Sequence, residues 1–249
     1  MKSFAIGIFL LTLTARIPSW RTNEHPLIAA AKSGDINRIK ASVETDKNLA
    51  NLKRYDGVPL IYFAAVNGHV DVVTYLLDRG VNVNALNDDE PLLHIAVNAN
   101  NLEFVKLLIQ RGAKVNLPTK NGKYMPIHGV CTSENPEIAK LLISHGASVS
   151  SKSKEGLTPL HRCKSRAVAE VLIKNGANVN AKDVNGYTPL HWFATPREII
   201  DGPTIEYLLS EGADLNARDN QGLTARELAH KSEQWELIKI LDARAQPNP

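Results

Sequence analysis

Four histidines recur through the middle of the chain and have the most obvious chemical potential. They are His94, His128, His161 and His191. Imidazole titrates near neutral pH, so each could serve as a general acid or base or as a metal ligand. The motifs that usually carry such chemistry, Gly-x-Ser-x-Gly, a phosphate loop and His-Glu-x-x-His, do not occur in the sequence. The histidines stand singly, in similar local contexts.

The two cysteines, Cys131 and Cys163, are too few for a disulfide framework. Each lies just after one of the histidines, where other copies of the same pattern carry alanine. They stand one copy apart, so we expect them beyond the roughly 7 Å Cα separation that a disulfide tolerates. A zinc site would need cysteine and histidine converging at short spacing, which the sequence does not show. We therefore predict small buried side chains, no metal and no cofactor.

The elements that position these residues are clearest between residues 175 and 191. Gly176 follows the apolar run Val171–Ile173 and predicts a helix that ends in a left-handed residue. Residues 183–186 read Asp-Val-Asn-Gly, which is typical of a tight turn. Thr188 and Pro189 then predict the start of a second helix, with threonine capping free N–H groups and proline in the first turn.

This stretch resembles the ankyrin repeat, whose Gly-x-Thr-Pro-Leu-His signature stands here as residues 186–191. Helix-closing glycines recur at separations of 32, 34, 30 and 36 residues, around the family period of about 33. These glycines are Gly80, Gly112, Gly146, Gly176 and Gly212. The resemblance implies an all-α repeat solenoid, in which helix-turn-helix pairs are joined by β-turn fingers, with about seven copies over residues 25–242. It also implies that Thr158, Thr188 and the four histidines are structural, the histidines linking turn to helix.

The fifth and sixth copies depart from the regular length. The second helix of the fifth arrives about three residues early, and the sixth runs about three residues long through 196–203. Regular stacking does not require these changes, so we predict a partner site there, with tolerated loop drift as the alternative. An acidic partner would gain association rate and register from the local basic residues, and an aromatic residue would anchor it. The candidates are Lys152, Lys154, Arg162, Lys164, Arg166 and Trp192.

Composition narrows the class of partner. The formal net charge is +3 over 249 residues and aromatic residues make up 6%, so strong nucleic-acid binding is not expected. We predict a monomeric, non-catalytic protein–protein interaction module that binds on its concave face and finger tips. The alternative is a secreted effector of a host-associated bacterium acting on a host protein. Small-molecule binding or catalysis ranks below both.

The first residues suggest export. Met1 and Lys2 precede an apolar run of about a dozen residues that ends with a small residue, Ala15. We predict a cleaved signal peptide over 1–15 and a linker over 16–24, which gives a periplasmic or secreted protein without a membrane span. An uncleaved anchor and a helix packed on the solenoid are the alternatives, and without cleavage the protein would be cytoplasmic. Residues 243–249 are expected to form a frayed tail.

Overall fold

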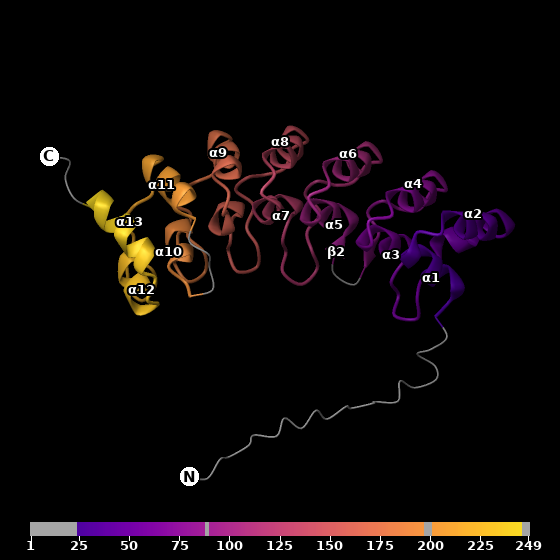
Figure 1. The fold of residues 1–249 in the computed structure, drawn as a ribbon, viewed down its shortest axis with the longest axis horizontal. Helices are drawn as coiled ribbons and strands as arrows, with labels where there is room; N and C mark the ends of the chain where they lie inside the picture. Colours follow the sequence, from indigo (N-terminus) through magenta and orange to yellow (C-terminus); the bar gives the residue numbers. More distant parts are fainter. Residues whose placement is uncertain (1–23, 88–89, 197–200, 246–249) are drawn as a thin grey trace, which may run out of the picture.

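The computed structural model describes residues 24–87, 90–196 and 201–245, so the predicted signal peptide and almost all of the predicted linker lie outside the described residues. Within this part, seven helical pairs stack side by side into an arc (Figure 1). The inner row consists of α1 (Pro26–Ser33), α3 (Leu60–Val66), α5 (Leu92–Asn98), α7 (Pro126–Ser133), the 3-10 helix η3 (Pro159–Arg162), α10 (Pro189–Phe193) and α12 (Ala225–Lys231). The outer row consists of α2 (Ile36–Thr45), α4 (Val70–Asp78), α6 (Leu102–Gln110), α8 (Pro136–Ser144), α9 (Arg166–Lys174), α11 (Gly202–Ser210) and α13 (Trp235–Ala245).

The glycines that close the outer helices have the predicted left-handed backbone. Their φ angles lie between 83° and 91°, and glycine alone adopts such angles without a Cβ clash. They are Gly80, Gly112, Gly146, Gly176 and Gly212. Each lies two residues after the end of an outer helix, where the chain continues toward the next finger. The regular spacing of these glycines therefore sets the period of the stack.

The fingers are tight turns held by side chains of their own. In the finger before α10, Asp183 Oδ1 accepts hydrogen bonds from the backbone N–H groups of Asn185 at 2.8 Å and Tyr187 at 2.9 Å. Gly186 then turns the chain with a φ of 79°. In the third copy the finger contains two short antiparallel strands, β1 (Leu86–Asn87) and β2 (Glu90–Pro91). A short 3-10 helix, η2 (Lys47–Asn51), precedes the first finger.

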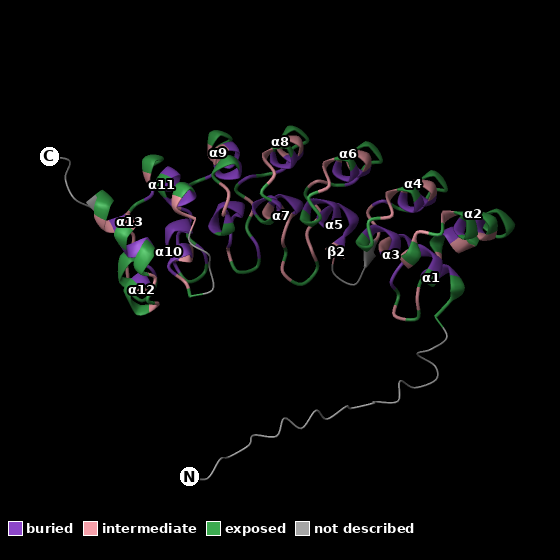
Figure 2. Cartoon of the chain, viewed as in Figure 1, coloured by how far each residue is buried: buried purple, intermediate pink, exposed green. Residues whose placement is uncertain are grey.

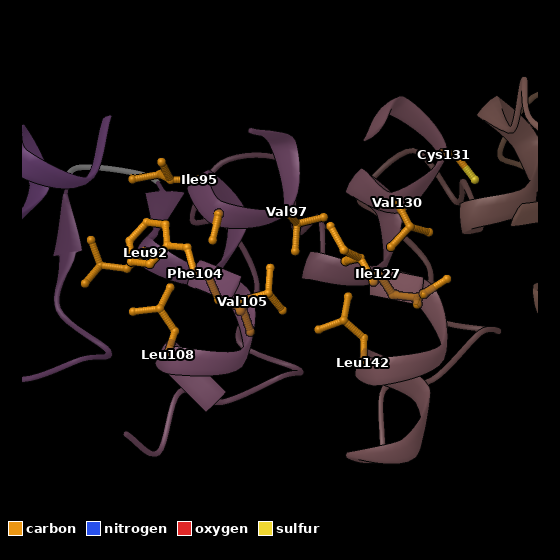
Figure 3. Close-up of a cluster of buried hydrophobic side chains, with 14 of the residues drawn as sticks. Leu92, Ile95, Val97, Phe104, Val105, Leu108, Ile127, Val130, Cys131 and Leu142 are labelled. Atoms are coloured by element: carbon orange, nitrogen blue, oxygen red, sulfur yellow. The ribbon is translucent and has the colours of Figure 1, made fainter. Parts of the chain in front are cut away.

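The apolar core runs continuously between the two rows and from each copy to the next (Figure 2). In the third and fourth copies, Phe104 and Leu108 of α6 lie beside Leu92 of α5, and Leu142 of α8 lies beside Ile127 of α7 (Figure 3). All five side chains are at most 2% exposed. Burying one such side chain contributes roughly 1.5–3 kcal/mol, so a lone pair of helices loses much of its stabilisation.

Three boundaries differ from the sequence-based expectation. The inner element of the fifth copy is a single turn of 3-10 helix, because the shortened segment leaves no room for a second turn before α9. Asp201 caps α11, which begins at Gly202, so the last residues of the segment 196–203 belong to a helix and not to an insertion. Helix α13 extends to Ala245 and includes the start of the predicted tail. In the described part of the chain, no helix is both long and apolar enough to cross a bilayer.

Gly176 and Gly202 provide a matched test of the left-handed caps. Replacing Gly176 with alanine should lower the free energy of unfolding by about 1 kcal/mol, because an L-residue is strained at its φ of 91°. A Cβ there would meet no atom within 4 Å, so backbone strain is the whole cost. The same change at Gly202, where a Cβ would lie 3.6 Å from Ile240 Cδ1, should be neutral or stabilising. Urea unfolding measures both, and equal losses would contradict the assignment.

Candidate functional site

Three of the four histidines bond to two copies at once. The Nδ1 atoms of His128, His161 and His191 accept the backbone N–H of the residue three places earlier, at 3.0, 3.0 and 3.3 Å. Their Nε2 atoms then carry the proton and donate to a carbonyl in the next finger, at 3.0 to 3.1 Å. Each ring therefore caps its own inner helix and ties that helix to the following copy. These bonds link turn to helix, which is the structural role that the resemblance implies.

The threonine before the inner helix occupies the cap position, as predicted. Thr158 and Thr188 each form a reciprocal capping box, in which the threonine side chain accepts the backbone N–H of the histidine and the histidine ring accepts the N–H of the threonine. Each hydroxyl also lies 2.8 Å from Nδ1 of its histidine. In the last copy the ring is replaced by a carboxylate, since Glu227 Oε2 accepts the N–H of Thr224 at 2.8 Å.

His94 is the exception among the four. Its Nε2 donates to the carbonyl of Tyr124 at 2.9 Å, but its buried Nδ1 has no partner in the described part of the chain. The residue three places earlier is Pro91, which has no N–H to donate and no hydroxyl. His94 thus keeps the hydrogen bond to the next copy but lacks the hydrogen bond that would cap its own helix.

Burial keeps the four rings neutral. It is the largest cause of the lowered pKa of His94, His128, His161 and His191, and it lowers the pKa of His94 to about 4. A ring that is neutral at pH 7 and already bonded on both sides is poorly placed to move a proton to a substrate. In the described ranges, no group of three or more His, Cys, Asp or Glu side chains is arranged to hold a metal ion.

The cysteines are buried free thiols, as predicted, but they are neighbours. Burial and, next, contact with Cys163 raise the pKa of the Cys131 thiol. Cys131 Sγ also donates to the carbonyl of Pro159 at 3.1 Å. The two side chains therefore fill the contact between the fourth and fifth copies. Their side chains meet because the neighbouring inner elements α7 and η3 pack directly on each other.

A second set of inter-copy bonds was missed from the sequence. Asn84, Asn116 and Asn180 each donate to the carbonyl of the glycine that closes the next outer helix, at 3.1, 2.8 and 2.8 Å. The signal was present, because each asparagine follows a valine at the same place in its copy. Ser150 stands at this position in the fifth copy.

A cavity of about 450 Å³ lies on the inner side of the third to fifth copies. Its lining comes from α5, α7, η3 and the fingers that precede them. These residues are Glu90, His94, Asn98, Thr119, Tyr124, Met125, His128, Gly129, Thr132, Leu157, Thr158, Pro159 and Arg162. It is within the size range of natural ligand sites, which is roughly 300–1,000 Å³.

A glycine allows two inner helices to approach closely at this cavity. The position after the signature histidine carries Ile95, Gly129, Arg162 and Trp192 in successive copies. Gly129 adds no side chain there, and a Cβ on it would meet Asn98 Oδ1 at 2.6 Å. The Asn98 side chain therefore packs against the Gly129 backbone, and both residues line the cavity.

Charge is distributed unevenly around this cavity. On the third-copy side, Glu90 Oε1 accepts a hydrogen bond from Asn98 Nδ2 at 3.0 Å, and burial raises the pKa of Glu90. On the fifth-copy side, Arg162 is exposed and forms no hydrogen bond or ion pair with any described residue. Between them, the ring of Tyr124 meets His128 edge to face, with centroids 5.5 Å apart.

The six residues predicted to bind a partner do not form one cluster. Arg162 lines the cavity, and Lys152 and Lys154 are exposed on the finger before η3. Lys164 is half-buried between η3 and α9. Arg166 lies on outer helix α9, where it pairs with Glu170 at 3.0 Å. Trp192 is half-buried and donates from Nε1 to Asp183 Oδ2 at 3.2 Å, so it supports the finger.

Known proteins match the chain in sequence. A family model described as ankyrin repeats (3 copies) matches residues 10–87, 27–119, 93–183 and 164–249. The mouse protein "60 kDa lysophospholipase" is 49% identical over 53 residues, which are 21% of this chain and 9% of that protein. The rice (Oryza sativa subsp. japonica) "E3 ubiquitin-protein ligase XB3" is 35% identical over 66 residues, which are 26% of this chain and 15% of that protein. The chain thus matches only a small share of the length of either relative.

Solved structures match the fold over nearly the whole chain. The crystal structure of the human ASB11 ankyrin repeat domain superposes with a TM-score of 0.76 at 26% sequence identity. The superposition covers 91% of this chain and 100% of that one. The arrangement of paired helices and fingers is therefore shared along the whole stack.

A substitution that gives the unpartnered Nδ1 of His94 a hydrogen-bond donor should stabilise the protein. Pro91→Thr would supply the missing N–H and hydroxyl, and should raise the free energy of unfolding by about 1–2 kcal/mol relative to the same change at Pro59. Pro59 caps α3 at the equivalent position, but the residue three places on is Tyr62, which cannot accept the bond in the same way. Urea unfolding of both variants measures the difference. Equal effects would show that the His94 ring does not use the new donor.

Proposed function

Because the chain belongs to the ankyrin repeat family, we propose that it is a non-catalytic module that binds a protein partner on its concave face and finger tips. Ankyrin repeats generally mediate protein–protein interaction, and a solenoid of this kind offers an extended concave binding surface. The structural match over 91% of the chain supports use of the whole stack as one scaffold.

One observation carries this proposal. Three of the four signature histidines are bonded at both ring nitrogens, whereas the position four residues after the signature residue is exposed in three successive copies and differs between them. It carries Val66, Asn98 and Thr132 in three successive copies. A rigid repeating frame that presents variable exposed side chains on one side is suited to recognising a surface.

Catalysis is not part of the proposal. The matched relatives include a lysophospholipase and ubiquitin ligases, but the matches cover 9% and 15% of the first two. Those names describe much longer proteins, of which this chain matches only a small part. In this chain His128, His161 and His191 are buried and bonded at both ring nitrogens, and burial lowers the pKa of all four signature histidines, which leaves them poor acids or bases for a substrate.

Charge reversal on two sides of the stack tests the binding face. Lys120→Glu, Lys152→Glu and Lys182→Glu change three exposed lysines of successive fingers, and should weaken capture of an acidic partner from native extract at least tenfold. Lys106→Glu, Lys140→Glu and Lys174→Glu make the same charge change on outer helices α6, α8 and α9 and should leave it intact. Quantitative mass spectrometry of captured proteins is the measurement. Loss in the outer-helix variant alone would place the partner on the convex side.

We also propose that the module acts after export, either as a binding module outside the cytoplasm or as an effector on a host protein. The support is the sequence of residues 1–15, with a basic start, a short apolar run and a small residue at Ala15. Mass spectrometry of the mature N-terminus should find a chain that starts after Ala15. An intact Met1 on a cytoplasmic protein would contradict export. Imaging of a secretion-reporter fusion in host cells separates the two roles.

A further inference from the structure

We infer that the cavity between α5, α7 and η3 is an anchor site for an acidic segment of a protein partner, which inserts a large apolar side chain and sets a carboxylate against Arg162. This inference rests on the proposed function, because it assigns the chemistry of the partner to one place on the concave face. Shape, wall chemistry and charge support it independently.

The shape favours a side chain presented by a protein. Asn98, Thr132 and Arg162 line the cavity and are themselves exposed, so its rim opens to solvent. Small-molecule sites commonly enclose about 70–90% of their ligand, which an open rim of this kind does not do. A volume of about 450 Å³ accommodates a large aromatic side chain and part of the adjoining residue.

The walls favour an apolar anchor. The ring of Tyr124 and the apolar side chains of Met125, Leu157 and Pro159 form much of the lining. Aromatic rings pair well with other rings in offset or edge-to-face arrangements. Interface residues that carry most of the binding energy are enriched in Trp and Tyr and sit in such pockets.

Charge sets the orientation of the occupant. Arg162 is a guanidinium with no intramolecular carboxylate partner among the described residues, and it offers two parallel donors to a carboxylate. The two fingers beside the cavity add the exposed Lys120, Lys123, Lys152 and Lys154, with Glu155 as the acidic residue of that finger pair. At the opposite end, Glu90 is held by Asn98 and accepts hydrogen bonds. The carboxylate of the occupant therefore faces the fifth copy, and its donor groups face the third.

Selection of peptides from a phage-displayed library of random 12-residue sequences, against the full chain, tests the inference. Enriched peptides should share an aromatic or large aliphatic residue next to aspartate or glutamate. A synthetic copy of one such peptide should lose at least tenfold in affinity to Thr132→Trp, which fills the rim, and to Arg162→Gln. Replacing the aspartate or glutamate of the peptide with asparagine or glutamine should not weaken its binding to the Arg162→Gln variant any further.

Matched controls lie on the outer helix α2, where Thr45→Trp and Arg38→Gln change exposed residues of the same types and should bind as the unchanged chain does. Thermal unfolding checks that each variant is folded. If Thr132→Trp does not fold, the Arg162→Gln variant alone tests the site. Enriched peptides without an acidic residue, peptides insensitive to both cavity variants, or no enrichment at all would overturn the site. If peptide binding is lost only in the variant with Lys120→Glu, Lys152→Glu and Lys182→Glu, the cavity is not the site but the proposed function stands. If binding is lost only in the variant with Lys106→Glu, Lys140→Glu and Lys174→Glu, both the cavity site and the proposed function are wrong.

Discussion

Each helix pair has an apolar face that only the next pair can cover, and the rest of the structure follows from this constraint. Stability is then shared between nearest neighbours, so each junction must be held in a fixed register. The histidine rings fix it from the inner row, by donating Nε2–H to the next finger, and the asparagines fix it from the loops after the outer helices. Apolar burial supplies the attraction, and these hydrogen bonds select one relative position.

The same constraint explains why three of the four signature histidines and both cysteines are engaged in structural contacts. A histidine that caps one helix and bonds the next finger has no free nitrogen, and burial holds it neutral. The thiols of Cys131 and Cys163 are likewise buried in the contact between two copies. Side chains that leave the junction and differ between copies include Asn98, Thr132 and Arg162, which are exposed.

The sequence predicted what depends on one copy and missed what depends on several. The left-handed glycines, the Asp183 turn and the helix start at Pro189 are local, and the structure has them as predicted. The carbonyl that each histidine reaches, the contact of the two cysteines and the cavity each need residues about 30 positions apart to be placed together. Arg166 illustrates the limit: it is close to Arg162 in sequence, yet the short fifth copy puts it on the opposite row.

The irregular fifth copy matters for a reason that its length alone does not reveal. In the fourth copy, the fourth residue after the histidine is Thr132, still within inner helix α7. In the fifth, the equivalent residue is Ser165, which already caps outer helix α9. The inner element therefore stops at Arg162, one turn early, just where Gly129 of the preceding copy adds no side chain. A missing turn and a glycine fall side by side, with an exposed guanidinium at the edge of an apolar hollow.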